Sequence, residues 1–533
     1  MPPVPSADSL LSRAKSAARA GDVVGAVMAY LAVRERFPSN KRVAEGLAGL
    51  RPKLPDLLTA AQAAQAQGAW GEAERLLVAA FALAPEVAQI GTALAACRLE
   101  MGRAPAALRA AVAVLGRNPG DPVALNLKGR ALREMGQATA AEESLRAALG
   151  HPETEARTLT NLGLLARARG DRAVAADYFR RALALAPTDV GLHRNLAYAI
   201  TYTEEEPHLA EMRARLAAIG PETAEAVPLH FALFKALDDL GQRQQAFAHL
   251  QAGNRLEKAR LGYDFQTDAL PHALSRALFK SVPEPVAVKT PTSPRPIFVT
   301  GLPRSGTTLV ERILSRAEGV QPCGELTVVQ LAVGEMLREI MGREVRQITA
   351  ADIAALRARL IEALAEYSDG SPVIVDKMPQ DFRWIGYLCA ALPEARIVHV
   401  ARDPMAVAWS IYRLSFAGQG NAFAYDIGDI ARFMVLHRDL MAHWRGLYPD
   451  RIFDLDYARL VDTPDPATRD LAEAVGLDWS EDWLTPERAD AQALTASADQ
   501  VRRPIYQGSD AGWRAYEAEL APLRTALQRV GLV

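Results

Sequence analysis

The sequence has few cysteines, almost no net charge and no long apolar run. Its three cysteines, Cys97, Cys323 and Cys389, are too few and too scattered for a disulfide framework or a zinc site, and they favour a reducing compartment. A formal net charge of -2 gives no overall attraction to nucleic acid or to an acidic membrane surface. The N-terminus lacks the apolar core of a signal peptide, and no segment approaches the roughly 20 apolar residues of a membrane span. We therefore expect a cytoplasmic protein without a membrane span.

The first half of the chain is rich in Ala and Leu and carries an internal period. The 533 residues exceed one ordinary hydrophobic core, so two or more domains are expected. From residue 8 to about 260, glycines recur every 34 positions, an alanine follows each of them by five, and a proline follows most of them by 17. The 34-residue period is that of tetratricopeptide repeats. The best-spaced glycines are Gly68, Gly102, Gly136 and Gly170.

The residue types at these positions suit helical hairpins. Glycine permits the tight turn between two antiparallel helices, the small alanine lets the helices approach, and proline ends the second helix. Gly21 and Gly241 mark an early unit and a late, degenerate one. We expect an α-helical solenoid of about six or seven hairpins, of a type that binds a peptide or a protein.

A proline-rich segment separates the array from the rest of the chain. Ser281 to Pro296 contains five prolines, a density that forbids both helix and central strand and predicts a stiff, extended linker. The predicted organisation is therefore an array over residues 1–280, a linker over 281–296 and a second domain over 297–533.

The second domain alternates apolar runs with helical patterns. The runs are Ile297 to Thr300, Pro372 to Asp376, Ala395 to Val400 and Arg451 to Asp456. The helical patterns lie around residues 353–366, 382–391, 405–414 and 430–444. This alternation predicts an α/β domain with a mainly parallel sheet and with ligands at the carboxyl ends of its strands.

A glycine-containing loop opens this domain, in the stretch PIFVTGLPRSGTTLVERIL from Pro296 to Leu314. Strand, loop and helix are predicted in that order. Gly301 and Gly306 bracket four residues, as in the phosphate-binding pattern G-x-x-x-x-G-K-S/T, whose backbone N–H groups converge on an anion. Thr307 replaces the lysine that serves a triphosphate in that pattern, so the loop offers hydroxyls and an arginine instead.

The loop GLPRSGTT resembles the 5′-phosphosulfate loop of sulfotransferases, which bind 3′-phosphoadenylyl sulfate (PAPS). Four downstream segments extend the resemblance: Cys323-Gly324-Glu325, Asp376-Lys377-Met378-Pro379, Arg402-Asp403-Pro404 with Ser410, and SADQVRRP from Ser497 to Pro504. The chain is most similar to tyrosylprotein sulfotransferases and to bacterial sulfotransferases that carry tetratricopeptide repeats. The similarity covers residues 296 to about 515, and it implies a P-loop-like domain that uses PAPS as co-substrate and needs no metal.

The resemblance assigns roles to individual residues. It implies that Glu325 is the catalytic base, and that Lys377 and Ser497 act at the oxygen that leaves sulfur. A carboxylate can take the hydroxyl proton, and an ammonium can stabilise charge that develops in the transition state. The residues implied to bind the cofactor are Arg304, Ser305, Gly306, Thr307, Thr308, Arg402, Ser410, Tyr457, Gln500, Val501 and Arg503.

The chain departs from the tyrosylprotein pattern at two positions. Leu414 stands where that family has an arginine, with Arg413 one residue earlier, and Gly512 stands where it has a lysine. Either Arg413 or Arg502 is a candidate to replace the phosphate contacts that these departures remove.

Other interpretations remain open from the sequence. Glu325 could complement a helix dipole, Tyr457 could be a buried tyrosine at a strand end, and Val373 to Asp376 also resembles the strand and aspartate that hold Mg²⁺ in nucleotide hydrolases. The catalytic domain could be inactive in a repeat scaffold. The acceptor could be a protein tyrosine, a glycan, a lipid or a small phenol, and the predicted acceptor loop LTVVQLAVGEML after Glu325 is apolar.

The histidines of the second domain invite a catalytic or metal-binding assignment. His399 lies in an apolar strand and is predicted to be a core histidine, while His437 and His443 are six residues apart on a helix and do not share a face. No zinc or magnesium ligand set is visible in the sequence.

Overall fold

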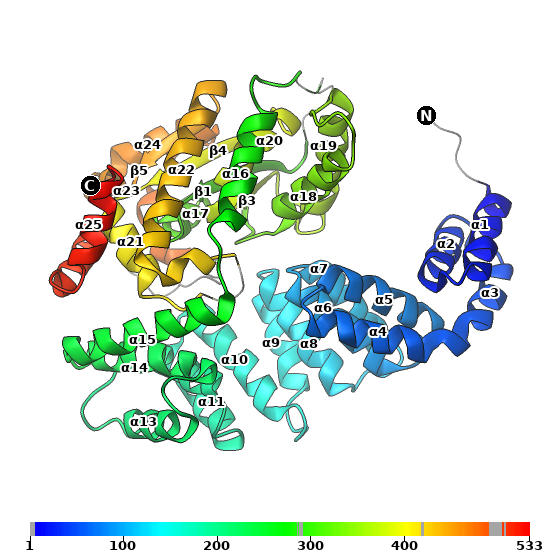
Figure 1. The fold of residues 1–533 in the computed structure, drawn as a ribbon, viewed down its shortest axis with the longest axis horizontal. Helices are drawn as coiled ribbons and strands as arrows, with labels where there is room; N and C mark the ends of the chain where they lie inside the picture. The colour runs from blue at the N-terminus through cyan, green and yellow to red at the C-terminus, as the bar shows by residue number, and fades with distance from the viewer. Residues whose placement is uncertain (1–5, 285, 287–291, 417–419, 490–503, 506–507) are drawn as a thin grey trace. The chain divides into compact units, whose positions relative to one another are not determined.

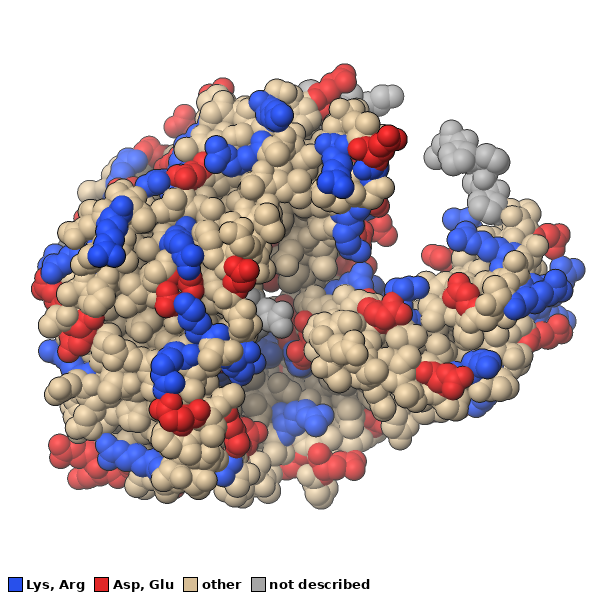
Figure 2. All heavy atoms as spheres, viewed as in Figure 1, with Lys and Arg blue, Asp and Glu red and all other residues tan. Residues whose placement is uncertain are grey.

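A computed structural model describes residues 6–284, 286, 292–416, 420–489, 504–505 and 508–533 (Figure 1). The contacts within the chain divide it into two compact units, Met1–Leu162 and Gly163–Val533. Within the described residues, no helix combines the length and the apolar character that crossing a bilayer requires. On the face in Figure 2, Lys and Arg are interspersed with Asp and Glu over both units, as the small net charge leads one to expect.

The first unit consists of helical hairpins, as the 34-residue period predicts. Its helices are α1 (Ala7–Arg19), α2 (Val23–Arg36), α3 (Arg42–Leu50), α4 (Leu54–Ala66), α5 (Trp70–Leu83), α6 (Ala88–Glu100), α7 (Ala104–Leu115), α8 (Pro122–Glu134) and α9 (Ala138–Ala147). Gly68, between α4 and α5, has φ +70°, a conformation that glycine adopts without strain. Ala73, five positions later, is completely buried, which lets the two helices approach closely. The helical array is therefore confirmed.

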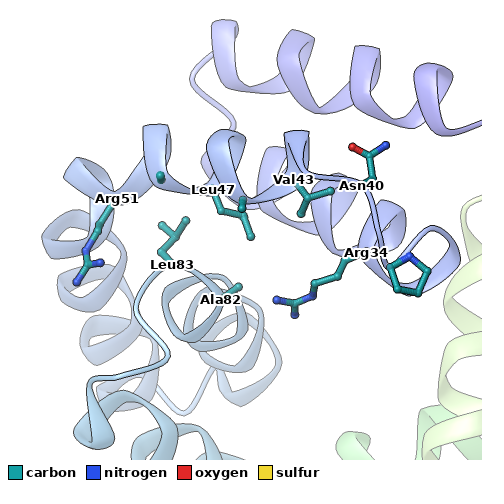
Figure 3. A pocket seen from close by; sticks show the side chains of 10 residues that line it. Arg34, Asn40, Val43, Leu47, Arg51, Ala82 and Leu83 are labelled. Atoms are coloured by element: carbon teal, nitrogen blue, oxygen red, sulfur yellow. The ribbon is translucent and has the colours of Figure 1, made fainter.

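A groove of 340 Å³ opens between the N-terminal helices of this unit (Figure 3). Val43, Leu47 and Leu83 give it an apolar lining, while Arg34 and Arg51 bring two guanidinium groups to it. Arg51 is paired with Glu86. The groove thus combines an apolar surface with positive charge.

Helix α10 (Glu155–Arg169) spans the division between the units, and further helices open the second unit. These are α11 (Arg172–Leu185), α12 (Val190–Ala199), α13 (His208–Ile219), α14 (Val227–Asp239), α15 (Arg243–Leu261) and α16 (Gln266–Leu278). The pair α14 and α15 turns at Gly241, whose φ is +71°. Gly170 and Gly241 are 71 residues apart, three more than two full periods, and Glu204 stands where the intervening glycine would be. The repeat formed by α12 and α13 is therefore irregular.

A five-stranded parallel sheet follows, in the order β2-β3-β1-β4-β5. Its strands are β1 (Arg295–Gly301), β2 (Val320–Pro322), β3 (Val373–Asp376), β4 (Arg396–Ala401) and β5 (Ile452–Asp456). β1 is central and pairs with β3 on one side and with β4 on the other. β2 and β3 lie on one side of β1, and β4 and β5 lie on the other, so the strand order reverses at β1. Ligands of such sheets bind where the strand order reverses.

Alternate residues of the central strand face two apolar cores. Ile297 and Val299 belong to a cluster with α17 (Thr307–Leu314) and α24 (Pro464–Val475), whereas Phe298 belongs to a larger cluster on the other face. The larger cluster involves α18 (Val328–Met341), α19 (Ala350–Ala365), α20 (Ile385–Ala391), α21 (Pro404–Tyr412), α22 (Ile427–Leu447) and α25 (Ala521–Arg529). Helices on both faces bury the sheet, which explains why its strands are continuous apolar runs.

The last repeat helices share this larger core. Phe234 of α14 and Phe247 of α15 lie in the same cluster as Trp409 and Tyr516. The Asp238 carboxylate accepts hydrogen bonds from the Tyr516 hydroxyl (2.6 Å) and from Arg413 Nη2 (2.7 Å). The packing thus joins residues 163–280 to the sheet domain, whereas the sequence predicts a boundary at 281–296. Residues 285 and 287–291 of that segment lie outside the described residues.

Two local predictions need correction. Residues 326–337, predicted as an acceptor loop, mostly belong to helix α18, whose apolar residues face the core at helical spacing and not an acceptor groove. The helix predicted over 382–391 begins as a 3-10 helix, Pro379–Trp384, and becomes α-helical only at Ile385. The edge strand β2 was not predicted, because three residues are too few to show a pattern.

Candidate functional site

Each of the five strands is followed at its carboxyl end by a residue that the sequence singles out. Arg304 follows β1, Glu325 follows β2, Lys377 follows β3, Arg402 follows β4 and Tyr457 follows β5. Because the strands are parallel, these ends lie on one edge of the sheet. The fold therefore brings together residues that are up to 153 positions apart in the chain.

The loop between β1 and α17 has the backbone of an anion-binding turn. Gly306 caps the helix with φ 108°, and Arg304 has φ 72°, which is unusual for a residue other than glycine. A Cβ on Gly306 would meet the Tyr457 ring at 2.3 Å, so only glycine lets this ring lie against the loop. The backbone strain at Arg304 is the kind that functional loops carry.

Three hydroxyl residues follow Arg304 and are buried: Ser305, Thr307 and Thr308. The Ser305 Oγ atom has no hydrogen-bond partner among the described residues. A buried hydroxyl without a partner costs free energy unless a ligand supplies one. A phosphate or sulfate oxygen at the N-terminus of α17 would supply it, so the loop fits the phosphosulfate group.

Two arginines and a serine form a cluster beside the loop. Arg304 Nε donates to Ser410 Oγ at 3.0 Å, and Arg402 Nη1 donates to the Arg304 carbonyl at 2.9 Å. The Arg402 guanidinium lies over the Tyr457 ring, 4.4 Å from its centroid, and its Nε donates to Asp510 Oδ1 at 2.6 Å. Contacts thus link Ser410, Arg304, Arg402 and Tyr457 in a row, which places two guanidinium groups and a hydroxyl close together.

Glu325 and Lys377 contact each other on the other side of the loop. Lys377 Nζ lies 2.5 Å from Glu325 Oε1, and the Lys377 amide N–H donates to the Gly324 carbonyl at 2.8 Å. The Lys377 side chain is completely buried, whereas the Glu325 side chain is 43% exposed. The lysine is therefore fixed within the protein, and the carboxylate faces solvent where an acceptor could reach it.

Two buried carboxyl groups hold the backbone on either side of Glu325. Glu311 Oε1, from α17, accepts the Gly324 amide N–H at 2.8 Å, and Asp376 Oδ1, at the end of β3, accepts the Leu326 amide N–H at 3.3 Å. Burial raises the pKa of the Glu311 carboxyl, and it raises the pKa of the Asp376 carboxyl well above its usual range. These residues connect the phosphate loop and the lysine strand to the backbone that carries Glu325.

Sequence reasoning missed the roles of Glu311 and Asp510. Glu311 lies in the helical stretch TTLVERIL. A carboxylate on the buried face of a helix is the signal that could have identified it as a functional residue. Asp510 stands 108 residues after Arg402, and no local pattern connects the two.

Several predicted site residues take no part in the described site. Ser497, Gln500, Val501, Arg502 and Arg503 lie outside the described residues. Arg413 pairs with Asp238 and lies 5.3 Å from the ring centroids of Phe234 and Trp409, so its guanidinium is directed to the repeat helices. Gly512 lies in a 3-10 helix, Ser509–Tyr516, and Leu414 follows α21.

His399 is a core histidine, as the sequence predicts. Its Nδ1 contacts Asp454 Oδ1 at 2.7 Å, and its Nε2 contacts His437 Nε2 at 3.0 Å. Burial lowers the pKa of both imidazoles, and His399 is buried while His437 is half-buried.

Comparisons with known proteins agree with this geometry. Residues 296–481 match the model of the sulfotransferase family, and residues 123–150 and 156–189 match tetratricopeptide repeat models. An uncharacterized protein of Aquifex aeolicus is 31% identical over 388 residues, which are 64% of this chain and 51% of that protein. The chain thus spans about half the length of that relative.

Other relatives are more distant. Protein-tyrosine sulfotransferase 1 of Danio rerio is 24% identical over 267 residues, or 44% of this chain and 71% of the relative. The solved sulfotransferase domain from the Synechococcus PCC 7002 olefin synthase is 17% identical, with a TM-score of 0.30, and the alignment covers 43% of this chain and 91% of that domain. The chain therefore contains tetratricopeptide repeats followed by a sulfotransferase-family domain.

Proposed function

We propose that this chain transfers a sulfuryl group from PAPS to a hydroxyl acceptor. The observation that carries the proposal is the contact between Glu325 and Lys377 beside a phosphate loop that contains a buried, unpartnered Ser305 hydroxyl. A carboxylate base and a buried ammonium are the two groups that sulfuryl transfer to a hydroxyl needs. The match to the sulfotransferase family supports PAPS as the donor.

The donor would bind along the carboxyl edge of the sheet. Its 5′-phosphosulfate would accept hydrogen bonds from the loop at residues 304–308, including Ser305 Oγ. Its 3′-phosphate would lie at Arg402 and Ser410, because a planar guanidinium and a neighbouring hydroxyl suit a phosphate. Tyr457 would support this clamp through its ring contact with Arg402. The wrapping of the nucleotide by Gln500, Val501 and Arg503 stays a prediction.

The reaction would need one proton transfer and one bond exchange at sulfur. The acceptor hydroxyl loses its proton to Glu325 as its oxygen attacks sulfur. The bond from sulfur to the bridging phosphate oxygen breaks, and the electron pair stays on that oxygen. Lys377 stabilises the charge that develops there, with Ser497 as the second predicted contact. The products are a sulfate ester and adenosine 3′,5′-bisphosphate.

We propose a protein tyrosine as the acceptor. The similarity to Danio rerio protein-tyrosine sulfotransferase 1 supports this choice, as does the presence of repeats that suggest protein-protein interaction. The groove of the first unit, with its apolar lining and with Arg34, suits a peptide segment that carries apolar side chains and an acidic residue. A glycan, a lipid and a small phenol are the other acceptors to test.

An inactive repeat scaffold and a Mg²⁺-dependent nucleotide hydrolase are the competing functions. The first is disfavoured because Arg304, Glu325, Lys377, Arg402 and Ser410 are all present. The second is disfavoured because the Asp376 carboxyl is completely buried and Oδ1 accepts a backbone N–H. Binding of adenosine 3′,5′-bisphosphate should therefore persist in EDTA and exceed that of ATP with Mg²⁺.

The test uses the full chain with sulfur-labelled PAPS and a panel of tyrosine peptides, glycans, lipids and phenols. Transfer to a peptide, lost in the Glu325→Gln variant, is the expected result. Nucleotide binding without transfer to any member of the panel supports the inactive scaffold. Preference for ATP with Mg²⁺ over the bisphosphate overturns the proposed donor.

A further inference from the structure

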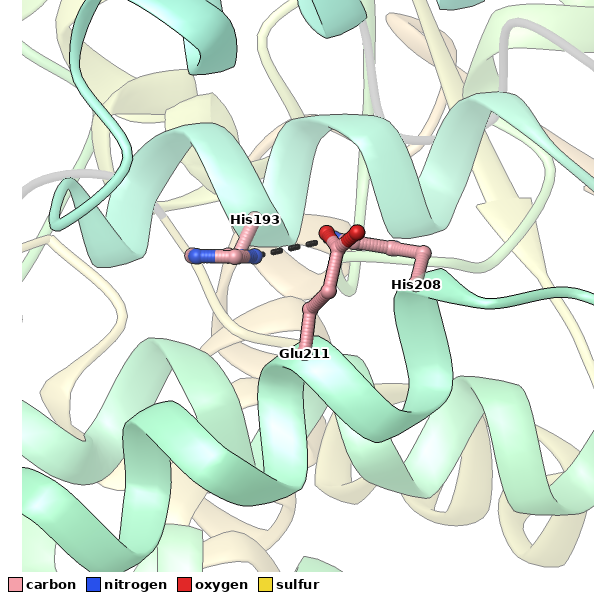
Figure 4. A group of neighbouring side chains, drawn as sticks. All are labelled: His193, His208 and Glu211. Atoms are coloured by element: carbon pink, nitrogen blue, oxygen red, sulfur yellow. Dashed lines mark hydrogen bonds between the residues drawn. The ribbon is translucent and has the colours of Figure 1, made fainter.

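A group of three potential metal ligands lies in the irregular repeat, away from the sulfotransferase residues. His193 comes from α12, and His208 and Glu211 come from the first turn of α13 (Figure 4). One ligand atom from each side chain lies within 4.8 Å of the other two. Because His208 and Glu211 are three residues apart, their side chains share one face of the helix.

The two imidazoles already face each other through one nitrogen each. His193 Nδ1 and His208 Nε2 are 2.9 Å apart and share a hydrogen bond, and the ring centroids are 5.1 Å apart with an angle of 9° between the planes, so the rings meet edge to edge. Both rings are buried, whereas Glu211 is exposed, and in the view of Figure 4 its carboxylate overlaps the end of the His208 ring. The group is therefore open to solvent on the carboxylate side.

The other nitrogen of each ring has a partner that suits a metal ligand. His193 Nε2 lies 3.2 Å from the Pro187 carbonyl, and His208 Nδ1 lies 2.7 Å from the Tyr202 hydroxyl oxygen. A histidine that binds a metal usually donates its second N–H to such an oxygen, which fixes its tautomer and ring orientation. Zn²⁺ would displace the hydrogen that His193 Nδ1 and His208 Nε2 now share, and both nitrogens would then offer lone pairs to the ion.

The distances suit a zinc-like ion once the two rings turn. Two ligands about 2.0 to 2.1 Å from a tetrahedral Zn²⁺ are about 3.3 Å apart, so the rings must separate slightly and rotate out of their edge-to-edge arrangement until both nitrogens point at the ion. The exposed Glu211 side chain can rotate to supply a third ligand. Two His and one carboxylate leave a fourth position for water, an arrangement that zinc accepts.

We propose that His193, His208 and Glu211 form a binding site for Zn²⁺ or a similar divalent transition metal that ties α12 to α13. This repeat lacks the glycine turn of its neighbours, and the segment that joins the two helices, residues 200–207, is not helical. The apolar cluster under it is small and includes Ala197, Tyr202, Met212 and Leu216. A metal bound by both α12 and α13, which flank this segment, would stabilise the irregular repeat.

The experiment measures metal bound by the full chain after treatment with chelator and reloading with Zn²⁺. We expect one equivalent of Zn²⁺ by elemental analysis, and Co²⁺ should give the visible absorption bands of a tetrahedral site. Glu211→Gln removes the anionic ligand and leaves the histidine contacts intact. The affinity of Glu211→Gln for Zn²⁺ should fall by at least about 100-fold. Loss of a residue that only hydrogen-bonds to a metal ligand costs up to about 100-fold, and loss of a ligand itself should cost no less.

A second histidine pair offers a matched control. His230 and His249 lie 3.0 Å apart through their Nδ1 atoms, and His230 Nε2 lies 2.9 Å from the Pro221 carbonyl. In the described part of the chain, this pair belongs to no group of three ligands within similar reach. His249→Gln should therefore leave Zn²⁺ binding unchanged.

Either of two results overturns the site. One is wild-type protein that retains no more Zn²⁺ than Glu211→Gln, with both proteins folded by circular dichroism. The other is loss of binding in His249→Gln together with full binding in Glu211→Gln. The readout does not depend on sulfuryl transfer, so it stands apart from the proposed function.

Discussion

Asp510 Oδ1 accepts a hydrogen bond from Arg402 Nε at 2.6 Å, at the guanidinium that the proposed function assigns to a phosphate. The Arg402 side chain is only 9% exposed, and the Asp510 side chain is 30% exposed. The Asp510 carboxylate thus neutralises much of the charge of this arginine. Asp510 therefore contacts the guanidinium at the place where the proposed function puts a phosphate.

We expect Asp510→Asn to bind adenosine 3′,5′-bisphosphate several-fold more tightly than wild type. The amide removes a negative charge that competes with the phosphate for Arg402 and would repel it once bound. Isothermal titration calorimetry measures the change. Asp439→Asn, which alters an exposed aspartate paired with Arg438, is the matched control and should change nothing. Weaker binding in Asp510→Asn would mean that the carboxylate positions Arg402 and does not compete with the ligand.

Removal of the Arg402 guanidinium should weaken nucleotide binding strongly. Arg402→Ala should cost about 2 to 4 kcal/mol, which is about 30- to 1000-fold in affinity, because one partner of a buried charged pair is lost. Arg438→Ala removes an exposed arginine and serves as the control. Normal binding by Arg402→Ala would place the 3′-phosphate contact elsewhere, and the first alternative would be Arg304.

The sequence predicts the place of a site residue where a recognisable motif lies at the end of a recognisable strand. The apolar runs gave β1, β3, β4 and β5 because buried parallel strands are apolar on both faces. Lys377 and Arg402 directly follow β3 and β4, and Arg304 lies three residues after β1. Glu325 follows β2, which is too short to recognise in the sequence.

Contacts that depend on packing between distant segments were not predictable. Glu311, Asp376 and Asp510 act through atoms that meet only after folding. The stretch after Glu325, predicted as an acceptor loop, is helix α18, because its apolar residues recur at helical spacing and pack on the core. The ligands His193 and His208 are 15 residues apart, a spacing that matches no familiar metal motif.

Asp238 should couple the last repeat helices to the sheet domain. Asp238→Ala leaves the Tyr516 hydroxyl and Arg413 without their acceptor, so we expect a loss of about 1.5 to 3 kcal/mol in the free energy of unfolding. Urea unfolding monitored by tryptophan fluorescence measures it, and Asp177→Ala, which alters an exposed pair with Arg181, is the control. Because the core is shared, residues 163–280 and 297–533 should unfold in one transition. Two separate transitions, with proteolysis between 281 and 296, would instead support the boundary that the sequence predicts.

The Glu394 carboxylate should give the folded state a defined acid sensitivity. Burial alone would raise its pKa, but hydrogen bonds from Arg357, at 2.8 Å, and from Thr292 together outweigh burial and lower the pKa from 4.5 to about 2. A lowered pKa stabilises the folded state above the unfolded pKa, and this stabilisation is lost as the pH falls. Wild-type stability should thus decline between about pH 4.5 and 2 more steeply than that of Glu394→Gln. Equal slopes in urea unfolding series would contradict the assignment, and Glu517→Gln serves as the exposed control.

The last prediction concerns the role of Glu325 as a base. Glu325→Gln keeps the size of the side chain and removes the proton acceptor, so turnover should fall by roughly 10² to 10⁴. Affinity for adenosine 3′,5′-bisphosphate should persist, because the loop and the arginine cluster are unchanged. The phenol of tyrosine has a pKa of about 10, well below that of an aliphatic alcohol, so transfer to an alcohol acceptor should suffer more than transfer to a phenol.

The measurement is steady-state transfer of labelled sulfate. The control is Glu335→Gln, which alters an exposed glutamate on α18 of the same domain. A loss of turnover with intact nucleotide binding would show that Glu325 has a chemical role. If Glu325 only completed an ion pair with Lys377, its replacement would first lower stability and nucleotide binding. Unchanged turnover would remove Glu325 from the mechanism. In that case Lys377, which is completely buried, would have only its charge to contribute, and the acceptor proton would have to leave by another route.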